Sequence, residues 1–529
     1  MGLAAAFLEI CRDHGDKVGQ VCDGRAHTYA DLLRGAGAVA DGLVAAGVRP
    51  GEHVGLLLAN GPDFIHAFLG ARLAGAVPLP FNARYKAYEL RHVIVESDAV
   101  LVLMHGSTSE TVRLDQLVEE AIPGILEARW PASLPHAPAL RGLVSMDDSF
   151  ASTLPGSRFR EGGQGWTGTS EPAEQGEIGM LCYTSGTTSF PRACMLRDEG
   201  LVAVSRGMAA RFGIGPGDRV WSPLPLFHTS ALQIMHAALL SGATYMTDSY
   251  FDPVRAARTF ADYPPTHFLP MFGLVARRIA EVLAGVPDGR ERLAQVRVMG
   301  ANMPREDQRK WQGLLPPGVN PFGGYGLTEG SGAISISNLD ETPEQRGAKL
   351  GVPLDCVTIR IRTEAGEEAR PGEEGEIEIR GPTVSLGYYK DEEKTRETRE
   401  GDWVRTGDRG KFHPDGQLEY TGRFKDMIKV GGENVAPLEI ETYLLTHPAV
   451  SQACVVGIPD AEYGEAPAAF VIPKPGMAPS ERELIAHCVG KLSRWKHPRR
   501  IVFVDAFPMS ATKVRRGELR ETMLELVKG

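Results

Sequence analysis

Helix-like and strand-like segments alternate along the N-terminal part of the chain, and this alternation constrains the fold more than any other feature. The helical segments are 29–47, 63–75 and 85–97, and the continuously apolar runs between and after them are 53–59, 76–82 and 99–104. Strands that are apolar throughout, rather than at every second residue, fit a sheet buried on both faces. The alternation therefore predicts an α/β fold with a parallel sheet covered by helices.

The remaining sequence changes character twice. A second alternating series runs from 179 to about 338, and short β-rich segments with turns follow Gly351. The last hundred residues or so, beginning near Lys425, have the pattern of a small α+β domain. Because 529 residues exceed what one hydrophobic core holds, we expect a large domain at 1–424 and a small domain at 425–529.

Charge and hydropathy narrow the class of partner. The chain has 57 basic and 67 acidic residues, a formal net charge of −10, which argues against a nucleic-acid surface or an anionic membrane partner. No apolar stretch reaches the length of about 18 residues that a membrane helix needs. The sequence predicts an enzyme or binding protein for small molecules, with no nucleic acid and no membrane span.

The cysteines and the N-terminal segment indicate a compartment. The seven cysteines are scattered, odd in number and never spaced as CxxC, which is typical of a reducing environment without disulfides or structural zinc. Residues 1–17 lack a basic segment before their apolar run, and Glu9 interrupts that run. We expect an amphipathic first helix there instead of a signal peptide, and a cytoplasmic protein.

A polar stretch between two apolar runs is the first candidate site. It contains hydroxyl and glycine residues in succession, followed by Pro191 and a cation: Thr184, Ser185, Gly186, Thr187, Thr188 and Arg192. Backbone N–H groups and hydroxyls in such a turn can donate to phosphate oxygens, and the cation offsets their charge. By itself this stretch fits a solvated polar loop equally well.

Three further segments favour a nucleotide site. Gly324, Tyr325 and Gly326 precede Thr328 and Glu329, which offers an aromatic face for a purine and a carboxylate for Mg²⁺. The second segment ends in Asp408, a carboxylate that can accept two ribose hydroxyls. The third supplies cations and a glycine pair: Arg423, Lys425, Lys429, Gly431 and Gly432.

With these motifs in this order, the chain resembles the adenylate-forming superfamily of acyl-CoA synthetases, peptide-synthetase adenylation domains and luciferases. The resemblance extends from about residue 29 to about residue 520. It implies a large domain of parallel-sheet α/β subdomains with a small β-barrel-like subdomain, and a small mobile α+β C-terminal domain. It also implies the activity: ATP converts a carboxylic acid into an acyl-adenylate with release of pyrophosphate, and coenzyme A then displaces AMP.

The resemblance also implies roles for individual residues. Residues 184–192 are similar to the phosphate loop, Tyr325 to the adenine contact and Thr328 to the α-phosphate contact. Glu329 and Thr188 would hold Mg²⁺, Asp408 would bind the ribose, and Arg423 would reach the ribose or phosphate. The other implied positions are the adenine-flanking Gly300, Ala301 and Asn302, the acyl-pocket His228, the hinge Lys425, the catalytic Lys513, and the pantetheine tunnel at Lys429 and 431–435.

The sequence departs from the family pattern at two places. The phosphate loop usually ends in G-x-P-K-G, and here Ser189 replaces a glycine and Arg192 the lysine; arginine keeps the charge but adds a planar fork. In its loop pattern the chain resembles crotonobetaine- and carnitine-CoA ligase-like members of the family. The C-terminal motif at 508–513 is one residue shorter than the usual P-x-T-x-T-G-K and lacks its glycine.

These departures leave alternatives open. The acceptor could be a carrier-protein thiol, an amine or, with nitrite activation, an aryl amine that is diazotised. A different class of protein is also open: a binding or regulatory protein that binds ATP without turnover. The acyl pocket would draw on His228, Met271, Phe272, Gly300 and 330–334. Its mixture of small and aromatic residues favours a short or aromatic acid over a long chain. A homodimer is also consistent with the resemblance.

Overall fold

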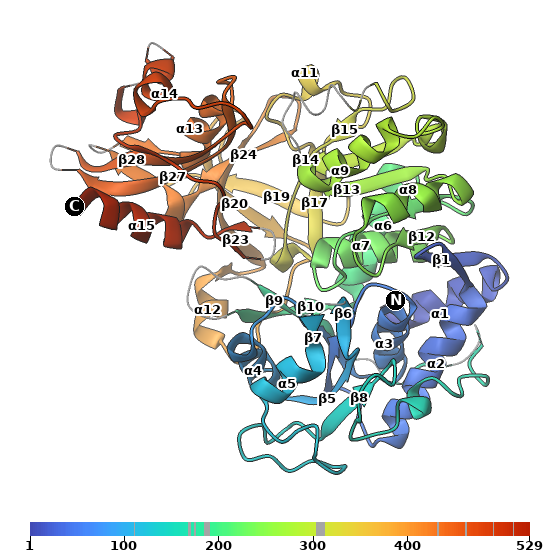
Figure 1. Cartoon of the computed structure of the whole chain (residues 1–529). Helices are drawn as coiled ribbons and strands as arrows, with labels where there is room; N and C mark the ends of the chain where they lie inside the picture. The colour runs from blue at the N-terminus through green and yellow to red at the C-terminus, as the bar shows by residue number, and fades with distance from the viewer. Residues whose placement is uncertain are drawn as a thin grey trace. The chain divides into compact units, whose positions relative to one another are not determined.

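A computed structural model gives the structure of the chain (Figure 1). It describes residues 1–109, 112–167, 171–173, 176–184, 191–302, 311, 313–430, 433–460, 463–489, 491–492, 494–510 and 513–528. The chain forms two compact units: unit 1 is Met1–Ile359 with Ile379–Val404, and unit 2 is Arg360–Glu378 with Arg405–Gly529. The predicted domain boundary at 424/425 is the position of a hinge. A division into compact units does not locate a hinge, so this boundary stays a prediction.

A seven-stranded sheet forms the centre of unit 1. Its order is β15 (Pro321–Phe322), β14 (Val298–Asn302), β13 (His267–Phe272), β11 (Arg219–Trp221), β12 (Thr244–Thr247), β1 (Val18–Cys22) and β2 (Arg25–Thr28). All neighbours are parallel except β1 and β2. The associated helices are α6 (Asp198–Phe212), α7 (Thr229–Leu239), α8 (Pro253–Asp262) and α9 (Gly273–Ala284). The N-terminal strand β1 thus pairs with a strand more than two hundred residues later.

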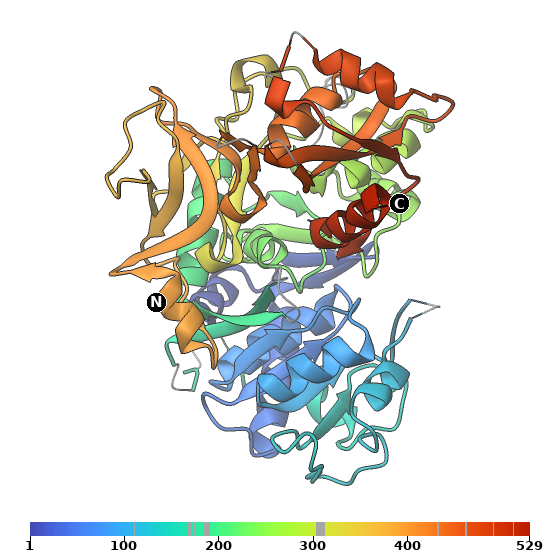
Figure 2. The same cartoon turned by 90° about the vertical axis from the view of Figure 1, so that its left-hand side faces the viewer.

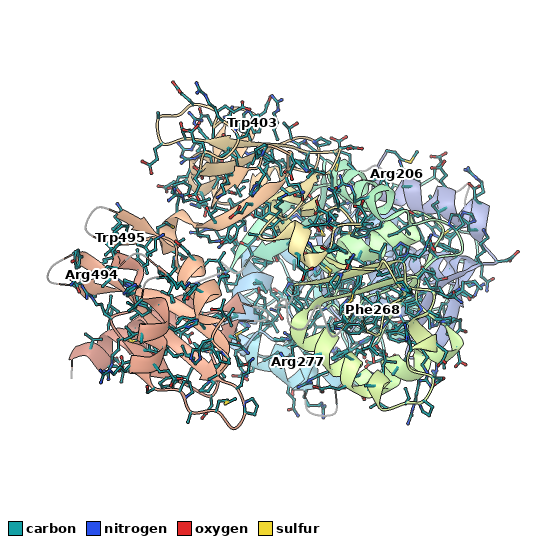
Figure 3. The ribbon with its side chains drawn as sticks, turned by 90° about the horizontal axis from the view of Figure 1, so that it is seen from above. Arg206, Phe268, Arg277, Trp403, Arg494 and Trp495 are labelled. Atoms are coloured by element: carbon teal, nitrogen blue, oxygen red, sulfur yellow. The ribbon has the colours of Figure 1, made fainter. Side chains whose placement is uncertain are left out.

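Aromatic side chains fill the core against this sheet. The rings of Trp221 and Phe268 stack at 4.9 Å, and both side chains are buried with Phe260 of α8 and Ile279 of α9. Figure 3 shows Phe268 inside unit 1, whereas the exposed Arg277 of α9 lies at its periphery. Burial of such large apolar surfaces is the main driving force that holds the helices to the sheet.

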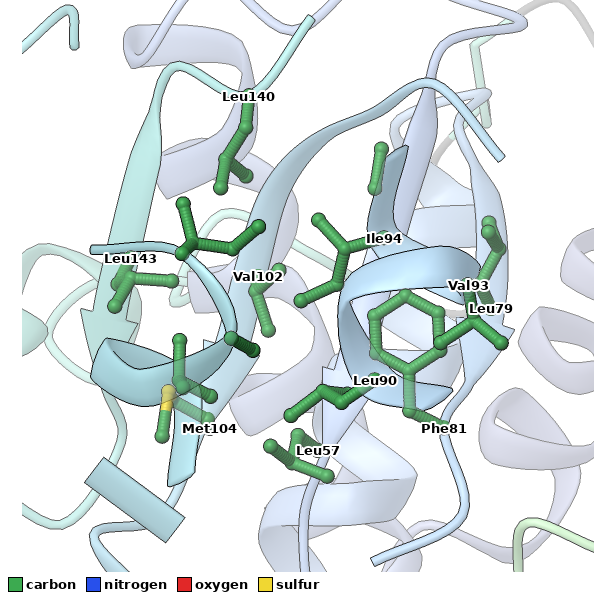
Figure 4. Close-up of a cluster of buried hydrophobic side chains, with 14 of the residues drawn as sticks. Leu57, Leu79, Phe81, Leu90, Val93, Ile94, Val102, Met104, Leu140 and Leu143 are labelled. Atoms are coloured by element: carbon green, nitrogen blue, oxygen red, sulfur yellow. The ribbon is translucent and has the colours of Figure 1, made fainter. Parts of the chain in front are cut away.

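A second, four-stranded parallel sheet forms the other core of unit 1. Its order is β4 (Val77–Pro80), β3 (His53–Leu57), β5 (Ala99–Met104) and β8 (Gly142–Ser145). Helices α4 (Ala87–Glu96) and α5 (Leu114–Ala121) cover one face (Figure 1 and Figure 2), and α3 (Pro62–Leu73) packs on β3 and β4. Leu90, Val93 and Ile94 of α4 meet Leu57 and Val102 of the strands (Figure 4). The helices α1 (Leu3–His14) and α2 (Tyr29–Ala45) complete the N-terminal segment.

Two small antiparallel sheets in unit 1 carry the ends of the predicted phosphate loop and the 324–329 segment. One has the order β21 (Gly387–Tyr388), β10 (Arg192–Arg197) and β9 (Ile178–Thr184). The other has the order β16 (Gly324–Leu327), β17 (Gly332–Ile336) and β18 (Val352–Pro353), with the short helix η3 (Thr328–Gly330) between its first two strands. Helix α12 (Glu392–Glu397) follows β21.

The β-rich segment and the C-terminal elements follow. The division between the units passes through a sheet of β19 (Thr358–Arg362), β20 (Gly375–Arg380), β23 (Trp403–Phe412) and β22 (Arg399–Glu400), with β24 (Leu418–Arg423) paired to β23. The last sheet contains β26 (Glu433–Val435), β25 (Ile428–Val430), β28 (Gly464–Pro473), β27 (Val450–Asp460) and β29 (Ile501–Phe503). Its helices are α13 (Pro437–Leu444), α14 (Glu481–Cys488) and α15 (Arg516–Lys528), and β30 (Met509–Ser510) pairs with β31 (Lys513–Val514).

The predicted fold class is confirmed. The apolar runs at 53–59, 76–82 and 99–104 become β3, β4 and β5, and every residue of β3, β4 and β5 is buried, as a sheet covered on both faces requires. The predicted N-terminal helix is α1. In the part of the chain that the structure describes, no helix has the length and apolar character needed to cross a bilayer.

Candidate active site

Four of the predicted site segments follow neighbouring strands of the seven-stranded sheet at one edge. His228 lies beyond β11, Met271 and Phe272 end β13, Gly300 and Asn302 lie in the last residues of β14, and Gly324 follows β15. Phe272 is the register partner of Asn302. Because these strands are parallel, their carboxyl ends share the edge at which ligands of open α/β sheets bind. The side chains of Ala301 and Asn302 lie outside the described residues.

Gly300 is a position where no larger side chain fits. A Cβ atom there would lie 2.6 Å from the ring of Phe322 and 2.9 Å from the sulfur of Met271. Met271 itself has a φ of 57°, in the left-handed region that a non-glycine residue rarely adopts. The end of β13 is thus turned so that the thioether packs against the Gly300 backbone, and the two residues form one wall.

The glycines of β16 allow a close approach of the facing strand β17. A Cβ on Gly326 would lie 2.3 Å from the carbonyl oxygen of Gly332, and one on Gly324 would lie 2.8 Å from that of Ser335. Tyr325, between them, is buried, with 6% of the residue exposed. The glycine spacing that suggested a nucleotide motif therefore also has a packing reason in this hairpin.

Gln233 of α7 was not predicted from the sequence, yet it fixes the start of β17. Its amide accepts from the Ala333 N–H at 2.7 Å and donates to the Ala333 carbonyl at 2.9 Å. Gln233 is 2% exposed, and its oxygen lies 2.4 Å from where a Cβ of Gly332 would stand. No motif in the sequence marks this residue, because a glutamine in an apolar helix carries no spacing signal.

Glu329 is held at both its backbone and its side chain. Its Oε1 accepts a hydrogen bond from the hydroxyl of Tyr388 at 2.6 Å, and its carbonyl accepts from the Ser385 N–H at 2.8 Å. Burial raises the pKa of the Tyr388 hydroxyl far above its ordinary value, and the Glu329 carboxylate raises it further, so the tyrosine is the donor. Beside it, Ser331 ends η3 in the left-handed region and donates to the Thr383 carbonyl at 2.6 Å.

The two ends of the predicted phosphate loop are paired with each other. Thr184 ends β9, Arg192 begins β10, and the two are register partners in the antiparallel pair. The Thr184 hydroxyl donates to the Arg192 carbonyl at 3.4 Å. The predicted Ser185, Gly186, Thr187, Thr188 and Ser189 lie outside the described residues.

Asp391 holds the cation of this loop. The Nε of Arg192 donates to Oδ2 of Asp391 at 2.9 Å, and Oδ1 accepts from the Lys394 N–H at 2.9 Å as the cap of α12. The Lys394 N–H and then Arg192 hold the pKa of the Asp391 carboxyl below its ordinary value. Like Tyr388, Asp391 was not predicted as a site residue.

Asp408 and Arg423 form an ion pair in unit 2. They are register partners in β23 and β24, and the Arg423 Nε donates to the Asp408 Oδ1 at 2.8 Å. Only 4% of the Asp408 side chain is exposed, against 32% for Arg423. Burial opposes the charge of the guanidinium, but Asp408 holds the pKa of Arg423 above its ordinary value. Burial and then Asp408 raise the pKa of the neighbouring Tyr420 to about 12.

The predicted lysines are distributed over unit 2. Lys429 is exposed in the middle of β25, and its N–H donates to Glu465 at 3.0 Å. Lys513 begins β31 and is the register partner of Ser510 of β30. Gly431 and Gly432 lie outside the described residues, as do the side chains of Lys425 and Lys513.

A divalent cation would find few protein ligands here. Among the residues that the structure describes, no group of three or more His, Cys, Asp or Glu side chains could hold a metal ion. Mg²⁺ binds through one or two carboxylates and completes its shell with substrate phosphates and water. A single carboxylate held by a neutral donor, as Glu329 is by Tyr388, fits that mode of binding.

Two family models match the chain. The one described as AMP-binding enzyme matches residues 7–389, and the one described as AMP-binding enzyme C-terminal domain matches residues 439–513. Together they contain most of the candidate site: the polar loop, the 324–329 segment and Lys513. The first alone matches well over half of the chain.

Individual proteins are similar over nearly the whole length. The sulfoacetate–CoA ligase of Cupriavidus necator is 31% identical over 510 residues, which cover 94% of this chain and 92% of that protein. The feruloyl-CoA synthase of an Amycolatopsis species is 30% identical over 503 residues, 94% of each chain. Among solved structures, the anthranilate CoA ligase AuaEII in complex with anthranoyl-AMP superposes with a TM-score of 0.83 at 26% identity, covering 100% of this chain and 98% of that one.

Proposed function

We propose functions for individual residues from one premise: the chain belongs to the AMP-binding enzyme family. It is an AMP-forming acid–thiol ligase that activates a carboxylic acid with ATP and transfers the acyl group to coenzyme A, releasing pyrophosphate and AMP. The carboxyl edge of the seven-stranded sheet supports the residue assignments most directly. There His228, Gly300 and the segment beginning at Gly324 follow neighbouring strands.

In the adenylation step, two anions must meet. Gly300, Ala301, Asn302 and Tyr325 flank the adenine, Thr328 contacts the α-phosphate, and Arg192 with the Thr184–Thr188 hydroxyls and amides receives the other phosphates. Asp408 binds the ribose, and Arg423 reaches the ribose or a phosphate. Donors and cations fixed in place before the reaction stabilise the charge that develops at the α-phosphate without reorganising.

Mg²⁺ is the proposed metal, and Glu329 and Thr188 are its proposed ligands. Bound there, the cation would neutralise phosphate charge as the pyrophosphate leaves. The carboxylate of Glu329 is already oriented by Tyr388, so it needs no rearrangement to accept a cation.

Lys513 is the proposed cation over the acyl carboxylate and the α-phosphate. One lysine cannot stay over the phosphate while a thiol approaches the same face, so we propose that a domain hinged at Lys425, residues 425–529, rotates between the two half-reactions. In the second state Lys429, Gly431 and Gly432 line the pantetheine path.

The acid is proposed to be aromatic or short. Gly300 and Met271 form a closed wall beside the acyl pocket, since even a Cβ on Gly300 would meet Phe322. His228 begins α7 with its ring 4.5 Å from that of Phe227, which supplies an aromatic surface at the same edge. The relatives that act on ferulate and anthranilate are consistent with an aromatic substrate.

ATP–pyrophosphate exchange with a panel of acids tests the function. Exchange that depends on an aromatic or short acid is expected, and no exchange with any acid at any Mg²⁺ concentration would refute the proposal. Mass spectrometry of the products with and without coenzyme A tests the acceptor. A thioester is expected only with coenzyme A, whereas an amide or a diazonium product would assign a different nucleophile.

A cytoplasmic location and a homodimeric state are proposed as well. None of the seven cysteines, all of which lie in the described part of the chain, forms a disulfide, which supports a reducing compartment. Light scattering during size-exclusion chromatography measures the oligomeric state, and a monomeric mass would refute the dimer.

A further inference from the structure

One short segment of unit 1, residues 385–391, contacts two charged residues of the proposed phosphate site, Arg192 and Glu329. It runs beside β10: the Leu386 N–H donates to the Met195 carbonyl and the Tyr389 N–H to the Ala193 carbonyl, each at 2.8 Å. Tyr388 is the register partner of Cys194. Through this pairing the segment is fixed to the strand that begins at Arg192.

The same segment fixes Glu329 twice. Its first residue, Ser385, donates its N–H to the Glu329 carbonyl at 2.8 Å, and Tyr388 donates its hydroxyl to Oε1 at 2.6 Å. Together these bonds set both the position of the Glu329 backbone and the direction of its carboxylate. At its other end, Asp391 pairs with Arg192 at 2.9 Å.

Two thiols, those of Cys182 and Cys194, also interact with Glu329. Cys182 and Cys194 are buried register partners in β9 and β10. Burial and then the Glu329 carboxylate raise the pKa of Cys182 to about 12; burial likewise raises the pKa of Cys194 well above its ordinary value. Neutral thiols are weak donors, so the tyrosine hydroxyl is the strong donor that orients this carboxylate.

We propose that Tyr388 is a positioning residue for the divalent cation: its hydroxyl holds Oε1 of Glu329 so that Oε2 is presented to the metal. This inference rests on the proposed function, in which Glu329 is a Mg²⁺ ligand. A metal-binding carboxylate is usually oriented by such an outer hydrogen bond, and removing the outer partner typically weakens metal affinity about 10-fold to 100-fold. Tyr388 itself does not touch the nucleotide in this proposal.

Tyr388→Phe removes only the hydroxyl, and Tyr389→Phe is the matched control. Tyr389 is the next residue and also donates its hydroxyl to a carboxylate, that of Asp98 at 2.9 Å. The measurement is Mn²⁺ binding to the full chain saturated with ATP in the absence of any acid, followed by electron paramagnetic resonance. We expect Tyr388→Phe to raise the Mn²⁺ dissociation constant at least about 10-fold. Tyr389→Phe should leave that constant unchanged, and Tyr388→Phe should leave the KM for the acid unchanged.

Wild-type Mn²⁺ affinity in a folded Tyr388→Phe would overturn the inference, as would an equal loss in Tyr389→Phe. Melting curves establish that the variants are folded. Tyr388→Gln retains a hydrogen-bond donor, so it should bind Mn²⁺ more tightly than Tyr388→Phe, and weaker binding would count against positioning. If Tyr388→Phe does not fold, Tyr388→Met, which also lacks the hydroxyl, takes its place in both comparisons.

Glu329→Gln separates the inference from the function on which it rests. If Glu329→Gln leaves Mn²⁺ binding unchanged, the metal role of Glu329 fails and the inference fails with it. If Glu329→Gln weakens binding and Tyr388→Phe does not, only the positioning role is refuted. In the double variant, Tyr388→Phe should have no further effect, because its action passes through Glu329; a further loss of the full size would show that it acts elsewhere.

Discussion

Replacing Asp408 by asparagine tests how the nucleotide ribose is bound. The Asp408 carboxylate is buried, with 4% of its side chain exposed, and Arg423 holds its Oδ1 at 2.8 Å. Asparagine has nearly the same shape, but it has no charge and only one acceptor oxygen. If the carboxylate accepts the two ribose hydroxyls, Asp408→Asn loses at least one of these bonds and weakens the other.

The expected magnitude follows from the charge on the acceptor. A hydrogen bond to a charged group contributes about 1.5–3 kcal/mol, and each 1.4 kcal/mol is a factor of about ten in an equilibrium constant. The KM for ATP in pyrophosphate exchange should therefore rise about 10-fold to 100-fold. Titrations with ATP, 2′-deoxy-ATP and 3′-deoxy-ATP give the assay its specificity, because the wild type should discriminate against both deoxy nucleotides and the variant should discriminate less.

Glu378→Gln is the matched control in the same unit. Glu378 is also a buried carboxylate, 0% exposed, and Arg360 donates its Nε to it at 2.8 Å. Loss of this carboxylate should leave the discrimination between ATP and its deoxy forms unchanged, since no ribose role is assigned to it. The ribose assignment would be refuted by a folded Asp408→Asn that discriminates like the wild type.

The other predictions concern the catalytic lysine and stability. Lys513→Ala should abolish adenylation in pyrophosphate exchange yet leave thioester formation from supplied acyl-adenylate; equal loss of both would contradict the hinge. Asp198→Ala removes the carboxylate that pairs with the fully buried Arg72 at 3.1 Å and should lower the free energy of unfolding by about 3–5 kcal/mol in urea titrations. Asp13→Ala, at an exposed position, should cost under about 1 kcal/mol. Burial raises the pKa of Asp248 from 3.8 to about 6, so ionisation of this carboxyl lowers the stability of the fold as the pH rises through that range. Asp248→Asn should remove this pH dependence and raise the free energy of unfolding at pH 7.5 by on the order of 1–3 kcal/mol. An unchanged dependence of stability on pH would contradict this expectation.

Apolar periodicity predicted the layers of the fold but not the order of the strands. The runs that became β3, β4 and β5 could be identified as buried parallel strands because both their faces are apolar. That β1 lies between β12 and β2 could not be predicted, since periodicity reports burial of a segment and not its distant partner.

The same limit applies to the site. Thr328 and Glu329 stand in a recognisable motif, but the tyrosine that orients Glu329 is 59 residues further along, and the aspartate that pairs with Arg192 is 199 residues further along. A side chain that acts through one hydrogen bond across such a separation leaves neither a spacing pattern nor a composition bias. Tyr388 and Asp391 therefore become visible only when β21 pairs with β10.

The two proposed nucleotide carboxylates share one feature: each is oriented by a hydrogen-bond donor within its own unit. Glu329 and its donor Tyr388 both belong to unit 1, and Asp408 and its donor Arg423 both belong to unit 2. Each carboxylate is thus oriented by a partner in its own unit, so its orientation does not depend on where the other unit lies. Pre-orientation of this kind removes a reorganisation cost from the chemical step. With the proposed hinge at Lys425, Glu329, Tyr388, Asp408 and Arg423 all lie before the hinge, in 1–424. A rotation of 425–529 would therefore bring Lys513 to the nucleotide or withdraw it while Glu329 and Asp408 each keep the geometry proposed for metal and ribose binding.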